Sequence, residues 1–435
     1  MIPLLLVAPA IWNGYPLLQW DTGGYLARWY EGYLVPSRST VFGLYLHLGQ
    51  SSYFWINLGL QAFATLWTLL IALNGFGIAR PWKIAAIASV LCVTTALPWL
   101  TSLLLTDIYA GLATLAVMLL VLQGARLSTA EKVFLWVLIA FSVASHSATL
   151  VMLLGMWLVG AMAKPFLRAR ISGKGLWQSL ASMAAGAVLL VATNYAFSGT
   201  LAWTPGGPSI VFGRMMQDGI VARYLNDHCA TEKLKLCPHR HDLPATADQF
   251  LWGKSVFNSL GRFQGLGDEM AHIAWRSLIE YPGMQVKTSL ISTAKQLAMV
   301  ATGDGVHNGV GHTYGIFERY LRGQLKPLRA AHQQQGRLDF TAINWLHVPV
   351  AFGSALMLAG VIGFAMWRKK ADDLSIFAAA TVTAILGNAF ICGALSGPHD
   401  RYGARMAWLA TFVVLIAVVR WMDWHDDKRA ANPSA

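Results

Sequence analysis

The chain is 435 residues long, and 55% of these residues are hydrophobic while only 12% are charged. Together with a mean hydropathy of +0.48, this composition excludes an ordinary soluble globular protein and predicts an integral membrane protein. The net charge is +12, but much of the positive excess lies in short loops beside apolar runs, where it indicates orientation and contact with membrane lipids rather than nucleic-acid binding.

Apolar runs that approach the length of a membrane helix recur along the chain. A helix needs roughly 17 to 25 apolar residues to cross a bilayer. Ten windows are candidates, near residues 2–18, 53–75, 84–100, 106–123, 133–145, 148–163, 177–197, 345–367, 374–393 and 405–421. The predicted fold class is therefore an all-α polytopic membrane protein with about ten transmembrane helices. The fifth window is short, and it is left open whether the fifth and sixth windows both cross completely.

Positive charge beside the apolar runs predicts which way the chain faces, because Lys and Arg near the ends of spans favour the cytoplasm. With ten spans, one side receives Arg80, Lys83, Arg126, Lys132, Lys164, Arg168, Arg170, Lys174, Arg368, Lys369, Lys370, Arg420, Lys428 and Arg429. This agreement places both termini in the cytoplasm of a bacterial inner (plasma) membrane. The polar loops between the other ends of the spans are then extracytoplasmic.

Four parts follow from this arrangement. Residues 1–197 form an N-terminal transmembrane bundle with a first external loop at 19–52, residues 198–344 an extracytoplasmic and largely helical segment between spans seven and eight, residues 345–421 the C-terminal transmembrane helices, and residues 422–435 a cytoplasmic tail. Within the long segment, residues 265–280 and 284–299 mix apolar and charged side chains at helical spacing. That pattern predicts amphipathic helices, some of them lying on the bilayer.

One pair of cysteines lies in the long external segment. Cys229 and Cys237 are separated by seven residues, which predicts a disulfide that closes a small loop in an oxidising compartment. Zinc is an alternative, because His228, His239 and His241 surround the pair, although this spacing matches no familiar zinc module. The other two cysteines lie in apolar runs and are predicted to be packing residues.

The first external loop begins with an aspartate directly after the first apolar run. Asp21 is followed by Gly23 and Gly24, and glycine lets the backbone approach a ligand closely. A carboxylate in this position is suited to deprotonating a hydroxyl or holding a cation. A compatible alternative is that Asp21 caps a short helix. Arg38, later in the loop, is a candidate ligand of a substrate phosphate, and Arg28 is a secondary candidate.

A second aspartate, Asp107, stands at the external start of the fourth apolar run. A carboxylate beside so much apolar sequence costs several kcal/mol unless it is solvated, paired or at the interface, so it is a functional candidate. Capping of the helix by Thr106 or Asp107 is the alternative. His146, between the fifth and sixth runs, is a weaker candidate because it is flanked by two serines, as is typical of a polar turn.

The most polar stretch of the C-terminal third, residues 396–405, lies between two apolar runs. A glycine and a proline interrupt the preceding helix, so the polar residues after them are expected at the bilayer surface. Arg401 and Arg405 share a helical face at i, i+4 and are predicted to fork onto one phosphate. The alternative is an interfacial anchor made of arginine and tyrosine. The candidates in this stretch are His399, Asp400, Arg401, Tyr402 and Arg405.

Taken together, these features resemble the GT-C class of membrane glycosyltransferases. The resemblance covers the membrane layout and the short motifs: an aspartate after the first membrane helix, a second acidic position at a later external helix start, a large extracytoplasmic segment, and an Arg-Tyr turn opening a late helix. It implies transfer of a sugar from a polyprenyl-phosphate carrier to a glycan or lipid acceptor. It also implies that Asp21 is the base or a metal-linked carboxylate, that Asp107 is a second acidic site residue, and that Arg401 with Arg405 clamps the carrier phosphate. Tyr402 matches the Arg-Tyr pair, His399 and Asp400 are included for their proximity, and a divalent cation, Mg²⁺ or Mn²⁺, is a candidate cofactor.

Two other functions stay open. A glycan polymerase or ligase would rely on arginines and histidines rather than on Asp21. A lipid-linked glycan flippase or transporter would need a polar path through the spans. The charged candidates gather at one membrane face, which favours an enzyme, although the spans also contain the uncharged polar residues Asn57, Gln61, Asn194 and Asn388.

Overall fold

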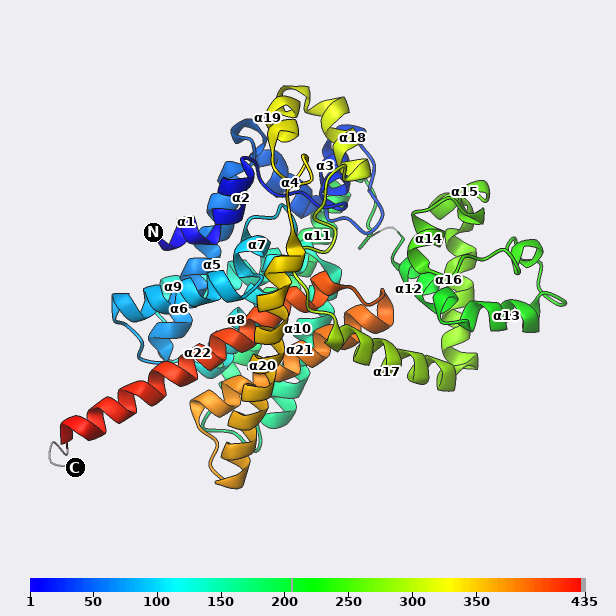
Figure 1. Ribbon diagram of the computed structural model, residues 1–435. Coiled ribbons are helices and arrows are strands. Elements are labelled where there is room, and N and C mark those ends of the chain that lie inside the picture. Colours follow the sequence, from blue (N-terminus) through cyan, green and yellow to red (C-terminus); the bar gives the residue numbers. More distant parts are fainter. Residues whose placement is uncertain (205, 432–435) are drawn as a thin grey trace.

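The computed structural model describes residues 1–204 and 206–431 (Figure 1). Within these residues the regular elements are helices, and strand-like pairing is limited to one isolated parallel bridge between Leu17 and Leu103. The all-α fold class is thereby confirmed. The predicted tail at 422–435 is helical through Ala431, and its last four residues lie outside the described part of the chain.

Five of the described helices are long and apolar enough to cross a membrane, which indicates a membrane protein. They are α5 (Trp55–Gly75), α11 (Gly173–Ser198), α20 (Phe340–Trp367), α21 (Asp373–Leu395) and α22 (Asp400–Ala431). Three shorter helices are also apolar: α6 (Pro81–Thr94), α8 (Asp107–Leu122) and α10 (Ser147–Ala163). All eight overlap predicted windows, although α22 extends beyond its window at both ends, and α9 (Thr129–Ser145) overlaps the window between α8 and α10.

Two predicted windows are interrupted by proline. The first becomes α1 (Ile2–Leu6) and α2 (Ala8–Asn13), and the third becomes α6 followed by α7 (Leu97–Thr101). Proline lacks the N–H that would continue the preceding helix and its ring clashes with the previous turn, but it fits the first turn of a new helix. A proline occupies that first turn in α1, α2 and α7.

The helix α8 is the centre of the bundle. All of its residues from Asp107 to Val121 are buried, and it packs against α5, α9, α11 and α22. A helix that is apolar on every side is stable when neighbours surround it in this way. Gly111 permits the approach of α22, since a Cβ atom there would lie 2.8 Å from the ring of Trp408. Because α8 is internal, its first residue, Asp107, is held inside the protein.

Ion pairs connect loops that the positive charges predict to be on the same membrane side. Arg126, after α8, and Arg170, before α11, both pair with Asp373 at the start of α21, the first at 3.4 Å. Lys83, at the start of α6, pairs with Asp423 near the end of α22. These ion pairs join the positively charged loops at one end of the bundle.

This clustering leads to a test of topology. We expect a cysteine introduced at the exposed Gly323 to react with an impermeant maleimide added to intact cells, and one at the exposed Lys370 to react only after the membrane is opened. The reason is that Lys370 lies in the basic loop before α21, whereas Gly323 belongs to the long segment between α11 and α20. The opposite labelling pattern would place the candidate site on the cytoplasmic side.

The long segment between α11 and α20 is built from two parts rather than one. Residues 207–280, which we call the disulfide subdomain, have their own apolar core and stand to one side of the bundle (Figure 1). The later part, residues 299–339, packs with the first external loop, as in the contact of α18 (Gly311–Tyr320) with α3 (Thr22–Glu31). The helices of the subdomain are α12 (Gly207–Gln217), α13 (Ile220–His228), α14 (Ala247–Leu251), α15 (Val256–Ser259) and α16 (Arg262–Glu280).

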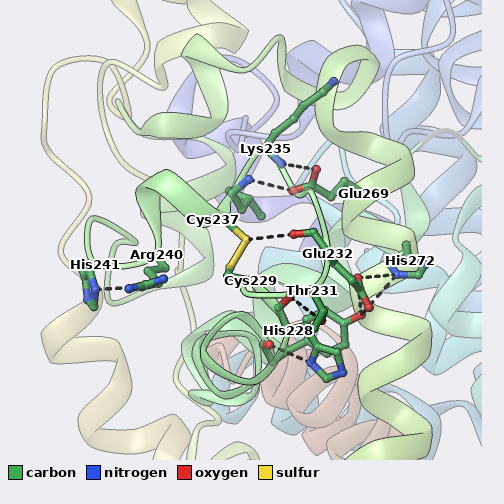
Figure 2. Close-up of a disulfide and its surroundings, with 12 residues drawn as sticks. His228, Cys229, Thr231, Glu232, Lys235, Cys237, Arg240, His241, Glu269 and His272 are labelled. Atoms are coloured by element: carbon green, nitrogen blue, oxygen red, sulfur yellow. Dashed lines mark hydrogen bonds and ion pairs between the residues drawn. A yellow bond between two sulfur atoms is a disulfide. The ribbon is translucent and has the colours of Figure 1, made fainter.

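The predicted disulfide is confirmed. Cys229 and Cys237 are joined with an S–S distance of 2.00 Å, so neither thiolate is free to bind zinc (Figure 2). Beside the disulfide, Glu232 accepts hydrogen bonds from the Tyr224 hydroxyl at 3.1 Å and pairs with His272 at 3.2 Å. These contacts fix the loop between α13 and α14 to the surface of α16.

Candidate active site

Backbone pairing brings the two aspartates to the same end of the bundle. The Leu17 amide donates to the Ser102 carbonyl, and the Leu104 amide donates to the Leu17 carbonyl, both at 3.0 Å. The Thr22 hydroxyl donates to the Leu104 carbonyl at 3.0 Å. The chain that leads to Asp21 therefore runs beside the loop that leads to Asp107.

The Asp21 side chain is held by two arginines. Asp21 occupies the N-cap position of α3, but its side chain makes no capping hydrogen bond. Instead Oδ1 pairs with Nη2 of Arg38, and Oδ2 accepts from Nη1 of Arg401 at 2.9 Å. The side chains of Asp21, Arg38 and Arg401 are 19%, 17% and 19% exposed. This ion triad is thus mostly buried, and each of its side chains keeps some exposed surface.

Burial and nearby charges shift the pKa values of Asp21 and His146. Burial works to raise the pKa of Asp21, but the positive charges of Arg38 and Arg401 outweigh it and lower the pKa to about 2. Burial, reinforced by the charges of nearby arginines, lowers the pKa of His146, at the junction of α9 and α10, to about 3. The carboxylate is therefore ionised at neutral pH, and the imidazole is neutral.

Glycine residues allow the close packing around the triad. A side chain at Gly23 would collide with Thr313 of α18, whose hydroxyl accepts from the Gly23 amide at 2.8 Å. At Gly24, an added Cβ would lie 3.1 Å from the Arg38 side chain. In the described chain these two glycines serve contacts within the protein, which explains their place beside Asp21.

Arg401 is oriented by its neighbours on α22 and by a loop. Its Nη2 donates to the Tyr402 hydroxyl at 3.0 Å, and its guanidinium lies 4.8 Å from the Tyr402 ring centroid. Its backbone amide donates to Asp304 at 3.3 Å. A guanidinium over an aromatic ring is favoured electrostatically, so the fork of Arg401 is held toward Asp21.

Arg405 belongs to a separate inner cluster. Its side chain is 1% exposed and pairs with Asp107, itself 5% exposed, at 3.2 Å. Other guanidinium nitrogens donate to Asn388 Oδ1, at 2.7 and 3.0 Å, and to Cys392 Sγ at 3.0 Å. The second oxygen of Asp107 is buried without a hydrogen-bond partner. Arg405 and Arg401 flank the same Tyr402 ring, at 5.1 and 4.8 Å from its centroid, but Arg405 is buried on Asp107 whereas Arg401 faces Asp21; a shared phosphate clamp stays a prediction.

The remaining predicted residues surround the triad without joining it. His399 lies between Asp304, at 3.5 Å, and Asp248 of the disulfide subdomain, at 3.6 Å. Asp400 accepts from the backbone amide of Ala301 at 2.9 Å. These two residues hold the loop that precedes α22 in place.

Arg28 lies farther along α3. Its Nε donates to Thr40 at 3.2 Å, and its Nη2 is buried without a partner. Its guanidinium is 5.9 Å from the Phe197 ring. Arg28 therefore helps to pack α3 against α4 (Thr40–Leu48) and α11, away from the Asp21 carboxylate.

Three residues at the site were not predicted as members of it. Asp304 lies between two glycines, a pattern that predicts only a loop. Asn388 was noted only for polarity within a span, although it accepts two bonds from Arg405. The Gln296 side chain donates to the His399 carbonyl and accepts from the His399 amide, both at 2.9 Å. A polar residue inside an apolar helix was the only sequence signal for Asn388.

The candidate cofactor, a divalent cation, would need a group of oxygen or nitrogen ligands. Across the described residues, no three His, Cys, Asp or Glu side chains gather as a metal site would require. Each oxygen of Asp21 already faces an arginine, so a cation at Asp21 would have to replace these contacts. Mg²⁺ or Mn²⁺ stays a prediction from the resemblance.

Comparison with known proteins finds no matching family model, no similar curated protein and no similar solved structure. The function of the chain is therefore inferred from the chemistry of its own residues.

Proposed function

We propose that this chain is a GT-C-like membrane glycosyltransferase that moves a sugar from a polyprenyl-phosphate carrier to a glycan or lipid acceptor of the cell envelope. The observation that carries the proposal is the semi-buried triad of Asp21, Arg38 and Arg401. Transfer from a phosphate-linked sugar needs positive charge to stabilise the departing phosphate and a base for the acceptor hydroxyl. The triad supplies both types of group in one place.

The triad suggests how substrate binding activates the base. A carboxylate with a pKa of about 2 is a weak base, because general bases work best with a pKa near the operating pH. Guanidinium forks bind phosphate bidentately, so the carrier phosphate competes with Asp21 for Arg38 and Arg401. Once the phosphate takes these contacts, the pKa of Asp21 rises toward its ordinary value and the carboxylate becomes a better proton acceptor.

The proposed sugar transfer forms one bond and breaks one bond at the anomeric carbon. The acceptor oxygen forms a bond to the anomeric carbon of the donor sugar while the bond from that carbon to the carrier phosphate oxygen breaks. The hydroxyl proton passes to Asp21, and the negative charge that develops on the phosphate is neutralised by Arg38 and Arg401. The buried pair of Asp107 and Arg405 supports the start of α22 from behind.

The proposed placement is the extracytoplasmic face of a bacterial inner membrane, with both termini in the cytoplasm. The five long helices, the three shorter apolar helices, α9 and the pair α1–α2 would together provide about ten crossings. Arg401 lies at the start of the apolar helix α22, so the triad that it forms with Asp21 and Arg38 is at the end of an apolar helix. A lipid-linked phosphate can reach such a position without leaving the bilayer interface.

Replacing Arg401 by lysine tests the phosphate-binding role. We expect Arg401→Lys to weaken binding of polyprenyl phosphate by about tenfold or more, because charge is kept but the bidentate fork is lost, and a hydrogen bond to a charged group contributes about 1.5 to 3 kcal/mol. Binding would be measured with the full chain in lipid nanodiscs. Arg319→Lys is the matched control, since Arg319 is 66% exposed and pairs with Glu31 away from the triad. Equal binding by Arg401→Lys and wild type would leave Arg401 as an interfacial anchor.

A further inference from the structure

Large apolar side chains remain exposed on two helices that are not among the five long ones. Trp275 and Ile279 on α16 are 71% and 72% exposed, and Val286 and Leu290 on α17 (Pro282–Ala298) are 61% and 63% exposed. Each pair has i, i+4 spacing, which puts its members on one helical face. We call these four residues the α16–α17 face. The two helices are consecutive and in contact, and exposed apolar side chains gathered in this way mark an interaction site.

The helix α17 buries polar side chains and exposes apolar ones, the reverse of a surface helix in water. Its buried positions are polar: Ser292 accepts from Arg214 at 2.6 Å, and Gln296 makes two hydrogen bonds to the backbone of His399. Its outward positions include Val286 and Leu290. A surface helix in water turns its polar side outward, so the surroundings of the outward side of α17 are apolar.

The position of α17 identifies these surroundings. It packs along α21, one of the helices long and apolar enough to cross a membrane, and a Cβ atom at Gly393 would lie 2.7 Å from the Ser292 carbonyl. On α21, Leu386 and Phe390 are themselves 48% and 49% exposed. The apolar side of α17 is therefore next to a spanning helix that also has exposed apolar side chains.

Lysine residues on α17 and the tryptophan of the face fit a membrane interface. Lys287 and Lys295 are exposed on α17, and lysine can keep its ammonium group among anionic lipid head groups while its stem lies against apolar surface. Tryptophan such as Trp275 is enriched at the same depth. We infer that the α16–α17 face is embedded in the head-group region of the bilayer and holds the disulfide subdomain against the membrane.

This contact would also set the depth of the candidate site, a consequence that rests on the proposed function. On the inner side of α17, the Gln296 side chain forms two hydrogen bonds with the His399 backbone. At the end of α17, the Met299 carbonyl lies against Gly403 of α22. Arg401 stands between these two contacts. A helix fixed at head-group level would thus hold Arg401 at the level of a lipid-linked phosphate.

Quenching by brominated lipids tests the inference without measuring activity. The full chain would carry Cys92→Ala, because Cys92 is a partly exposed free cysteine while Cys392 is buried. Single cysteines at Ile279 or Leu290 would be labelled with bimane, and the protein reconstituted in phosphatidylcholine–phosphatidylglycerol vesicles with or without bromine on the acyl chains. The lipid control is Leu356, 74% exposed on the spanning helix α20, and the water control is the exposed Lys254 of the subdomain.

Labels at both Ile279 and Leu290 are expected to lose at least half as much fluorescence as the label at Leu356. Quenching no greater than at Lys254 would overturn the inference, and quenching at only one position would overturn it for the helix that is not quenched. If neither is quenched but cysteines at Leu290 cross-link two chains, the face belongs to a second copy instead. Because the measurement needs no sugar transfer, an inactive protein that shows quenching would count against the proposed function alone.

Discussion

Asp21→Asn is expected to fold normally and to lose sugar transfer by about 10²- to 10⁴-fold, the usual contribution of a general base. Asparagine keeps the size of the side chain and one oxygen that can accept from an arginine. It cannot take up the proton of the acceptor hydroxyl. Because the Asp21 side chain does not cap α3, the substitution removes no helix-capping bond.

The measurement combines expression, thermal stability and transfer of labelled sugar from a polyprenyl-phosphate donor. Asp339→Asn is the matched control, since Asp339 is exposed, caps α20 through a 2.8 Å bond to the Thr341 amide, and asparagine caps helices about as well. A stable Asp21→Asn protein with wild-type turnover would refute the carboxylate mechanism and favour an arginine-dependent polymerase or ligase. If the wild-type protein transfers no sugar but moves a lipid-linked glycan, the chain is a transporter.

Local chemistry explains which features of the fold could be predicted. The long apolar runs and the disulfide followed from composition and spacing, because each depends on residues close in sequence. The broken first window did not follow, although its prolines were visible, because apolar content alone cannot say where a helix restarts. The division of the long segment also escaped prediction, since it depends on which of its helices bury one another.

For the candidate site as well, the candidate residues could be predicted from the sequence but their contacts could not. Charge in an apolar setting identified Asp21, Asp107, Arg401 and Arg405, and all four lie at one end of the bundle. Their pairing was not predictable from i, i+4 spacing, because the partners of Arg405 come from α8 and α21. The i, i+4 spacing places two side chains on the same face of one helix. Whether that face is buried depends on the other helices that pack against it.

The inner pair leads to the largest expected effect on stability. Arg405→Met should destabilise the protein by about 3 to 5 kcal/mol, because removal of one partner leaves an uncompensated buried charge. Here that charge is Asp107, whose other oxygen already lacks a partner. Unfolding in detergent would be followed by heat and by denaturant. The control Arg319→Met breaks an exposed pair with Glu31 and should cost no more than about 1 kcal/mol.

A second substitution separates the lost charge pair from lost packing. Adding Asp107→Asn to Arg405→Met removes the stranded charge, so the double variant should be more stable than Arg405→Met alone, and a double-mutant cycle gives the coupling between the two side chains. A double variant no more stable than the single one would show that Arg405 does not act by neutralising Asp107.

If the double variant is stable and still transfers sugar, Arg405 only supports the fold and the carrier phosphate is bound by Arg38 and Arg401. If it is stable but inactive, the inner pair takes part in catalysis, as the resemblance to GT-C enzymes implies for Asp107.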